Sequence, residues 1–317
     1  MRILVTGGNG YVGKALCRLL LPDHQVGVID NLRYGPPRFT AAEMSSMHWH
    51  SIDIRNRDAI RAAFEDFAPE VIIHLAAIHF IPECEGDPEL AISTNVLGTA
   101  NVAACCPPGC RLVFASSGAV YRPDDSPHDE VTSVVEPADV YGWTKLHGCQ
   151  YVRYFARERK FPACIVRLFN VIGPGETNPH VLPEIVAQLK ADRTSLRLGN
   201  LDAQRDYVHV ADVARGFASV AMGGSIEPGE TCTVNLGTQQ TYSVSQLLAL
   251  LREISSIDFR VDADPKRMRP SDRPFLAASN ARIGELFNWR PQVAMRDALC
   301  DLWRDPDLPQ AWIDRYR

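Results

Sequence analysis

A glycine-rich loop near the N-terminus stands between a predicted strand and a predicted helix. Residues 2–6 are mostly apolar and read as a buried strand, and Gly7-Gly-Asn-Gly-Tyr-Val-Gly13 follows at once. Apolar spacing then predicts a helix over 11–21. Glycines at such a junction let backbone N–H groups and the helix N-terminus approach a pyrophosphate. The loop therefore favours a dinucleotide-binding unit, and a glycine turn without a ligand is the alternative.

An acidic residue follows at the position where such units bind a ribose. A strand predicted over 25–29 ends in Asp30, twenty positions after Gly10. A carboxylate here accepts hydrogen bonds from the ribose hydroxyls of NAD and repels the 2′-phosphate of NADP. Arg33 is close in sequence and could accept that phosphate. NAD is favoured, and NADP stays open.

Strands and helices alternate through the first half of the chain. Further strands are predicted over 47–52, 70–75, 111–115 and 163–168, with helices over 56–67, 89–104 and 141–159. This order predicts an α/β fold with a Rossmann-like doubly wound parallel sheet, which binds ligands at the carboxyl ends of its strands. Asp53 and Ile54 at one strand end could cover an adenine, although Asp53 could instead cap a helix. Ala76 and Ala77 are small enough for a cofactor to lie against the backbone, or they only pack a helix.

The residue composition of the chain changes after Asn170. A turn-rich passage at 171–180 predicts a domain boundary, with a Rossmann domain over 1–170 that is rejoined by about 205–240. Residues 171–317 are expected to form mainly a smaller C-terminal α/β substrate domain. Helices are predicted there over 183–190, 211–222, 243–254, 280–287 and 294–303, with a strand over 231–236.

Composition excludes several classes of protein. The 317 residues carry a formal net charge of −5, which argues against an electrostatic grip on nucleic acid. No apolar stretch has membrane-spanning length and no leader-like segment is present, so we expect a cytoplasmic protein. The nine cysteines form no evident disulfide framework. Cys105, Cys106 and Cys110 lack the spacing of a zinc finger, so free thiols are favoured and no metal is predicted.

A tyrosine and a lysine four residues apart indicate proton transfer. On a helix, Tyr141 and Lys145 share one face, and the ammonium is expected to lower the pKa of the phenol. Ser117 follows the strand predicted over 111–115, at the same sheet edge as the glycine loop. An acidified tyrosine is a candidate general base.

Several motifs together resemble the extended short-chain dehydrogenase/reductase family. They are the glycine loop, Asp30, His74-Leu-Ala-Ala77, Ser117, Pro137-x-x-x-Tyr141-x-x-x-Lys145, Arg167-Leu-Phe-Asn170 and Arg205-Asp-Tyr-Val-His-Val210. Within that family the chain is similar to the nucleotide-sugar epimerases and dehydratases, above all the UDP-glucose 4-epimerases. The resemblance covers essentially the whole chain. It implies bound NAD, a UDP- or GDP-linked sugar as substrate, and a homodimer formed by the helices near 90–104 and 141–159.

The resemblance also implies roles for individual residues. Tyr141 would be the base, Lys145 would bind the nicotinamide ribose, and Ser117 would hold the reacting sugar oxygen. Residues matching cofactor-binding positions are Gly7, Gly10, Tyr11, Val12, Asp30, Asn31, Asp53, Ile54, Leu75, Ala76, Ala77, Asn95 and Lys145. Residues matching substrate-binding positions are His79, Ser117, Asn170, Val181, Leu182, Arg205 and Arg269. Asn95, inside a predicted helix, could instead brace nearby backbone, and Arg205 could pair with Asp206.

Departures from the family patterns keep other functions open. Gly118 and Ala119 stand where 4,6-dehydratases carry acidic residues, which disfavours dehydration. Gly199-Asn-Leu and Arg269-Pro-Ser-Asp272 look as much like GDP-sugar enzymes as UDP-sugar enzymes, so the nucleotide stays open. C4 epimerisation through a 4-keto sugar is favoured. A 4-ketosugar reductase using NAD(P)H and a non-catalytic dinucleotide-binding protein are the alternatives. Arg122 has no explanation at this level.

Overall fold

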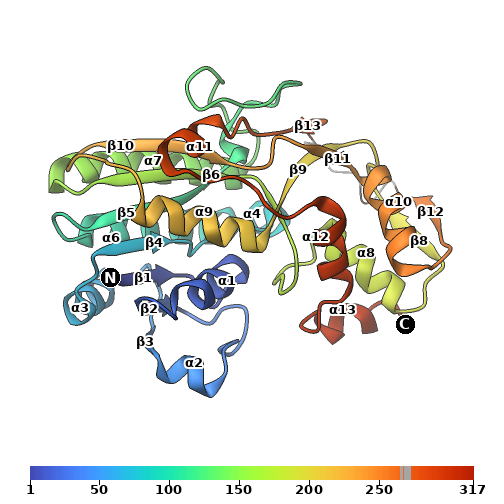
Figure 1. The fold of residues 1–317 in the computed structure, drawn as a ribbon, viewed down its shortest axis with the longest axis horizontal. Helices are drawn as coiled ribbons and strands as arrows, with labels where there is room; N and C mark the ends of the chain where they lie inside the picture. The colour runs from blue at the N-terminus through green and yellow to red at the C-terminus, as the bar shows by residue number, and fades with distance from the viewer. Residues whose placement is uncertain (265–266, 268–272) are drawn as a thin grey trace.

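The computed structural model describes residues 1–264, 267 and 273–317, and these form one large parallel sheet beside a smaller lobe (Figure 1). Within the described residues the large sheet has seven strands in the order β10-β6-β5-β4-β1-β2-β3, and every neighbouring pair is parallel. Its strands are β1 (Arg2–Thr6), β2 (Gln25–Asp30), β3 (Met47–Ser51), β4 (Val71–His74), β5 (Arg111–Ser117), β6 (Ala163–Leu168) and β10 (Thr231–Leu236). The predicted doubly wound sheet is confirmed.

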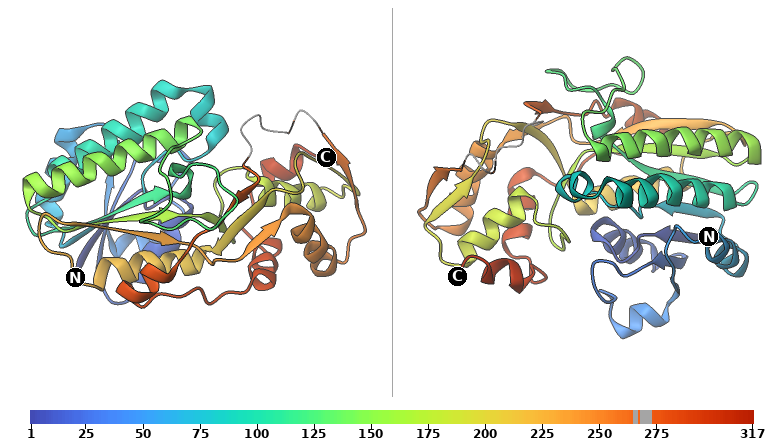
Figure 2. Two further views of the ribbon diagram at one scale, coloured as in Figure 1. Left: turned by 90° about the horizontal axis from the view of Figure 1, so that it is seen from above. Right: turned by 180° about the vertical axis from the view of Figure 1, so that it is seen from behind.

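Helices cover both faces of this sheet. One face packs against α1 (Tyr11–Leu20) and α9 (Val210–Met222), and the other against α3 (Arg57–Phe67), α6 (Gly98–Cys105) and α7 (Val140–Arg159). The rear view in Figure 2 shows α6 and α7 lying side by side. Phe217 of α9 and Phe114 of β5 are fully buried, one on each face. Truncating such a side chain to alanine costs about 3–5 kcal/mol, so these two layers fix the sheet that carries the site.

The smaller lobe has its own sheets and its own apolar core. Strand β9 (Gln204–His209) pairs with β7 (Asn170–Ile172), β11 (Thr241–Ser243) and β13 (Phe275–Leu276), while β8 (Ser195–Leu198) pairs with β12 (Arg260–Ala263). Its core lies among helices α8 (Val181–Lys190), α10 (Val244–Ser255), α12 (Met295–Trp303) and α13 (Gln310–Asp314). Between β9 and β11 the chain returns to the large sheet through α9 and β10. The division into domains at residue 170 stays a prediction.

The helix predicted over 89–104 differs most from the structure. Its place is taken by α5 (Pro88–Ile92), a π-helical turn (Ser93–Leu97) and α6, preceded by the short helix α4 (Ile81–Gly86). Asn95 lies in the π-helical turn and bonds the backbone of Ile78 in both directions, N–H to Oδ1 and Nδ2–H to C=O, at 2.8 Å each. These two bonds hold the end of the β4 loop against the helix. Helices interrupted by a π turn are frequent at functional sites.

Local capping explains where the helix with Tyr141 begins. Asp139 precedes α7, and its Oδ1 accepts a hydrogen bond from Gly142 N at 2.7 Å. Such a cap is worth about 0.5–2 kcal/mol and satisfies an N–H that the helix itself leaves unpaired. The helix start is therefore fixed at Val140, one residue before Tyr141.

Other sequence expectations concern the surface and the thiols. No helix in the described ranges is both long and apolar enough to cross a membrane. All nine cysteines are free, and the Cys105, Cys106 and Cys110 thiols contact backbone carbonyl oxygens. Arg122, unexplained by the sequence, is an exposed residue 3.9 Å from Glu136.

Candidate functional site

A cavity of about 500 Å³ lies at the carboxyl ends of the parallel strands. The large sheet contributes the loops after β1, β2, β4 and β5, and the smaller lobe contributes residues of β7, α8 and β9. This is where a doubly wound sheet binds its ligands. The size suits a cofactor or substrate of small-molecule dimensions.

The glycine loop forms one wall of the cavity through its backbone. Gly7 has a φ of +74°, and a Cβ there would lie 2.7 Å from the Ala76 nitrogen. A Cβ on Gly13 would lie 2.1 Å from the Gly7 oxygen, so neither position accepts a side chain. Gly10 is the N-cap of α1, and no side chain caps that end of the helix. Uncapped N–H groups at a helix N-terminus that lines a cavity suit an anion such as a phosphate.

Asp30 lines the cavity at the end of β2. Its Oδ2 accepts a hydrogen bond from Asn9 N at 3.0 Å, and its Oδ1 accepts one from Leu32 N at 2.8 Å. Burial raises the pKa of this carboxyl above its ordinary value. Arg33, the residue that kept NADP open, donates to Glu83 at 2.5 Å. Its positive charge is therefore partly neutralised by that carboxylate.

The other predicted cofactor residues divide into two groups. Those that line the cavity are Tyr11, Val12, Asn31, Ile54, Leu75, Ala76 and Ala77. Asp53 and Asn95 do not line it. Asp53 instead bonds Arg55 at 2.7 Å, which lowers the pKa of its carboxyl to about 2, and it accepts from Asn31 at 3.2 Å. Asn95 braces the backbone of Ile78, which was the alternative reading of this residue.

The predicted proton-transfer residues meet in the middle of the cavity. Ser117, Tyr141 and Lys145 all line it, and a hydrogen bond joins Ser117 to Tyr141. Lys145 Nζ donates to the Ala115 carbonyl at 2.8 Å and lies 5.9 Å from the centre of the Tyr141 ring. The helix spacing thus places the two side chains on one face, as expected.

The prediction that Lys145 lowers the pKa of Tyr141 is wrong. Burial raises the pKa of Tyr141 above its ordinary value, and the hydrogen bond with Ser117 offsets only part of this rise. Burial also lowers the pKa of Lys145 to about 8. The prediction that Lys145 lowers the phenol pKa treated both groups as solvated, whereas desolvation disfavours the charged form of each.

Predicted substrate residues lie at the side of the cavity formed by the smaller lobe. His79, Asn170, Val181, Leu182 and Arg205 line the cavity, and Arg269 lies outside the described residues. Asp206, the residue next to Arg205, is fully buried and accepts hydrogen bonds from Thr238, Gln239 and Ala278. The hydrogen bonds of its carboxylate thus go to the β10–β11 turn and to the residue Ala278 after β13.

Sequence reasoning missed a buried arginine in this wall. Arg273 donates to the carbonyl oxygens of Ala119 and Tyr121 at 2.8 Å each and lies 3.9 Å from Asp139. It therefore ties the smaller lobe to the segment after Ser117. Nothing in a single sequence separates such an arginine from Arg267 and Arg269, which precede it.

A cluster of Glu176, His79 and His180 was also missed. Glu176 is buried, its Oε1 accepts from Thr177 N at 2.7 Å and Asn178 N at 3.1 Å, and it lies 3.9 Å from His79 Nε2. Burial raises the pKa of Glu176 to about 7 and lowers that of His79 to about 4. The side-chain ligand atoms of the three residues lie within 4.8 Å of one another, a distance compatible with a metal ion. Glu176 is the buried acid of this wall, and only its place in a Gly-Pro-Gly-Glu turn could have indicated it.

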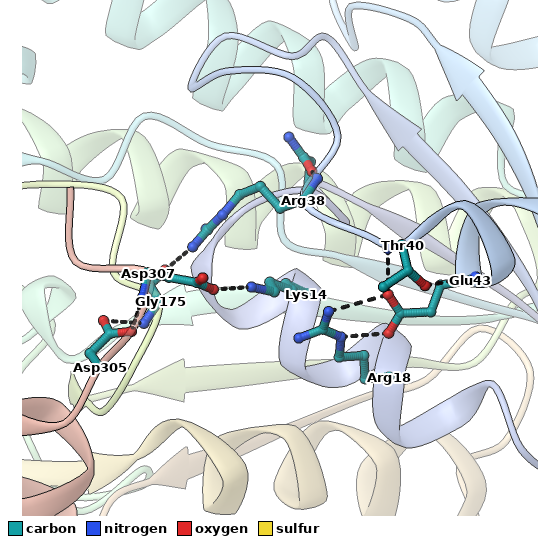
Figure 3. Close-up of polar contacts among 9 residues, drawn as sticks. Lys14, Arg18, Arg38, Thr40, Glu43, Gly175, Asp305 and Asp307 are labelled. Atoms are coloured by element: carbon teal, nitrogen blue, oxygen red, sulfur yellow. Dashed lines mark hydrogen bonds and ion pairs between the residues drawn. The ribbon is translucent and has the colours of Figure 1, made fainter. Parts of the chain in front are cut away.

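The loop that carries Glu176 is held at Gly175 by residues of two other segments, Arg38 and Asp305 (Figure 3). Gly175 donates its N–H to Asp305 at 2.8 Å and accepts from Arg38 Nη2 at 2.8 Å. Asp307, two residues after Asp305, accepts a hydrogen bond from Lys14 of α1 at 2.5 Å. We call residues 305–307 the C-terminal clasp, because they join the glycine-loop helix to the 173–178 loop.

Comparison with known proteins agrees with this geometry. The family model described as "NAD dependent epimerase/dehydratase family" matches residues 3–237. The chain is 30% identical over 309 residues to UDP-glucose 4-epimerase from Mycolicibacterium smegmatis, covering 94% of this chain and 96% of that protein. It is also 26% identical over 330 residues to GDP-6-deoxy-D-mannose reductase from Pseudomonas aeruginosa, covering 100% and 98%.

A solved structure agrees as well. UDP-glucose 4-epimerase from Thermus thermophilus, in complex with NAD, superposes with a TM-score of 0.83 at 27% identity, covering 96% of this chain and 98% of that one. The match spans both the sheet and the smaller lobe. The chain therefore belongs to the NAD-dependent epimerase/dehydratase family.

Proposed function

We propose that this protein is a nucleotide-sugar epimerase that inverts C4 of a nucleoside-diphosphate hexose through a transient 4-keto sugar. The observation that carries the proposal is the meeting of Ser117, Tyr141 and Lys145 in one cavity with the glycine loop and Arg205. Proton transfer from a secondary alcohol and binding of a diphosphate then fall within one site. The similarity to UDP-glucose 4-epimerases supports the same activity.

NAD fits one side of this cavity. The uncapped first turn of α1 suits the pyrophosphate, Asp30 suits the ribose hydroxyls, and Ala76 and Ala77 leave room beside the backbone. When bound, the nicotinamide supplies the hydride acceptor and, later, the hydride donor. Arg33 lies against Glu83, which favours NAD over NADP.

The side chains supply the proton chemistry. Ser117 would hold the C4 hydroxyl, and Tyr141 would remove its proton as the carbon is oxidised. Because burial raises the phenol pKa, ionised Tyr141 needs positive charge nearby, and Lys145 is the cation on the same helix face. After the keto sugar turns over, the same tyrosine returns the proton to C4–O. No net oxidation results.

A 4-ketosugar reductase is the second candidate. The reductase from P. aeruginosa is similar over the full length of this chain. This similarity supports a role of Ser117, Tyr141 and Lys145 in the net reduction of a 4-keto sugar. The nucleotide, UDP or GDP, therefore stays part of the test. Gly118 and Ala119 after Ser117 offer no acid for dehydration.

A panel of sugar nucleotides tests the proposal. Purified protein should release NAD on denaturation, and incubation with UDP-glucose, UDP-N-acetylglucosamine, UDP-glucuronate or a GDP-hexose should give one C4 isomer without stoichiometric NADH. Consumption of NADH or NADPH with a 4-keto sugar, and no isomer from any member of the panel, would replace the epimerase by the reductase.

A homodimer through α7 and the α5–α6 helices belongs to the same proposal. Large apolar side chains are exposed along these helices, namely Ile92, Leu97, Trp143, Tyr151 and Tyr154. Apolar surface gathered on neighbouring helices favours association. Light scattering should give about twice the 35.2 kDa chain mass. Tyr154→Glu should shift the particle toward one chain, and a monomeric unmodified protein would refute this part.

A further inference from the structure

Two cysteines face each other on neighbouring strands, away from the cavity. Cys164 of β6 is the register partner of Cys232 of β10, and the two strands are parallel. Directly opposed residues of neighbouring strands lie about 5 Å apart at Cα and present their side chains on the same face of the sheet. That separation is within the range that a disulfide spans. Neither cysteine lines the cavity.

The two thiols have unequal exposure. Cys164 is fully buried, whereas Cys232 is half-buried on β10, the edge strand of the large sheet. A hydrogen bond joins them. An oxidant from solution would therefore meet Cys232 first, with Cys164 already in contact behind it.

The charges around the pair favour a thiolate on Cys232. Arg282, on helix α11 (Ala281–Phe287) packed against β10, lies beside Cys232, and its buried Nε has no hydrogen-bond partner among the described residues. The Cys164 hydrogen bond and the neighbouring Arg282 lower the pKa of Cys232, and together they outweigh burial and the charge of Glu130, which raise it. Burial raises the pKa of Cys164, and Arg111 and Arg282 reduce this rise only slightly.

We propose that Cys164 and Cys232 form a peroxide-responsive dithiol, in which Cys232 reacts first and Cys164 completes a cross-strand disulfide. The Cys232 sulfur attacks a peroxide oxygen, the O–O bond breaks, and a sulfenic acid forms with release of water. The Cys164 sulfur then attacks the Cys232 sulfur, the S–O bond breaks, and a second water leaves. In total, two thiols and one hydrogen peroxide give one disulfide and two waters.

Other buried thiols of the described structure differ from Cys232 in the direction of their pKa shift. Cys17 is fully buried, and burial together with Asp30 raises its pKa. Cys106, beside Cys110, is likewise buried with a raised pKa. A low-pKa thiolate with a resolving thiol in contact marks a redox-sensitive site. Of the described cysteines whose pKa departs from its ordinary value, Cys232 is the one in which the pKa is lowered.

Peroxide titration with peptide mapping tests the proposal. The full-length protein is treated with hydrogen peroxide near neutral pH, blocked with iodoacetamide and digested. We expect one disulfide peptide joining residues 164 and 232, reversed by dithiothreitol. Cys164→Ser should instead leave a sulfenic acid on Cys232 that a dimedone probe captures, and Cys232→Ser should prevent both products. A Cys106–Cys110 disulfide in place of the 164–232 one, or no disulfide, would overturn the proposal.

Alkylation rates give a readout that needs no cysteine variant. In the untreated protein Cys232 should be the fastest thiol to react with iodoacetamide at pH 7. Arg282→Gln should slow it by about tenfold, because the thiolate fraction falls when the neighbouring cation is removed. Arg290→Gln is the matched control on the segment that follows α11. An unchanged rate in Arg282→Gln would refute the role of this arginine.

Discussion

The two ends of the cavity, which we propose for the cofactor and for the sugar and call the cofactor end and the sugar end, are built in different ways. At the cofactor end, the glycine loop and Asp30 lie within one βαβ unit, and the loop acts through its backbone: Gly7 and Gly13 accept no Cβ, and Gly10 leaves the first turn of α1 uncapped. At the sugar end the wall combines His79, Glu176 and Arg273, which are far apart in the sequence. A site made by backbone conformation is thus encoded locally, whereas a site made by side chains depends on the whole tertiary structure.

The largest expected effect lies where the two ends meet. Tyr141→Phe removes the hydroxyl that takes the C4 proton, so turnover should fall by about 10²–10⁴-fold while NAD stays bound. Tyr151→Phe is the matched control, because Tyr151 lies on the same helix and is exposed. Isomer formation and cofactor content are measured on both variants. Turnover by Tyr141→Phe close to that of the control would remove Tyr141 from the mechanism.

The next effect tests the burial of charge at the sugar end. Since burial raises the pKa of Glu176 from 4.5 to about 7, the folded state holds more protons than the unfolded state between these pH values. Stability should therefore fall as pH rises through this window, by up to about 3 kcal/mol. Glu176→Gln keeps an oxygen that can accept hydrogen bonds from Thr177 N and Asn178 N, and the amide side chain cannot ionise.

Denaturant unfolding at pH 4 and pH 8 measures this difference. Glu176→Gln should gain stability relative to the unmodified protein as pH rises, with the two nearly equal at pH 4. Glu83→Gln serves as a control carboxylate, with a partly exposed side chain in an ion pair with Arg33. Parallel pH curves for Glu176→Gln and the unmodified protein would show that this acid is solvated.

A smaller effect probes the cofactor end. Asp30→Ala removes the acceptor proposed for the ribose hydroxyls, so NAD affinity should fall by about 10–100-fold, the loss of a hydrogen bond to a charged group. Asp53→Ala is the matched control, since Asp53 follows the neighbouring strand without lining the cavity. Calorimetric titration with NAD compares the two. Equal losses in both variants would indicate a general weakening of the sheet edge.

The smallest effect concerns the contact that joins the two ends. Asp307→Asn removes the charge that pairs with Lys14, and Asp307 is 48% exposed, so the cost in stability should be about 0.2–1 kcal/mol. The affinity for NAD should fall by about twofold or less. Glu253→Gln breaks an exposed pair with Arg296 elsewhere and should leave NAD binding unchanged. Thermal unfolding with and without NAD separates the two variants.

The same contrast explains what the sequence could predict. Apolar periods and glycine spacing were enough for the parallel sheet, because strand and helix patterns are local. The sequence did not predict the break in the helix over 89–104, where Asn95 bonds the backbone of Ile78, because apolar spacing carries no information on such a contact. The spacing of Tyr141 and Lys145 in the sequence likewise predicted that they share one helix face, but it did not predict the burial that shifts their pKa values.

The candidate site residues were likewise predictable where their position depends on local sequence and not where it depends on tertiary contacts. The glycines, Asp30, Ala76 and Ala77 line the cavity as their strand-end positions suggested. Asp53 follows the end of β3 and is turned toward Arg55, because a charged neighbour two residues away competes for its carboxylate. Glu176 and Arg273 escaped notice because a buried charge reads like a surface charge in a sequence.

The C-terminal clasp also bears on how the protein is made. Lys14 and Asp307 are 293 residues apart. At synthesis rates of about 5–20 residues per second, the partner of Lys14 is made about 15–60 s after the glycine-loop helix. A nascent chain therefore presents its dinucleotide loop well before the segment that joins it to the Glu176 loop exists. Residues 305–307 are therefore added long after the locally encoded end of the site has been made.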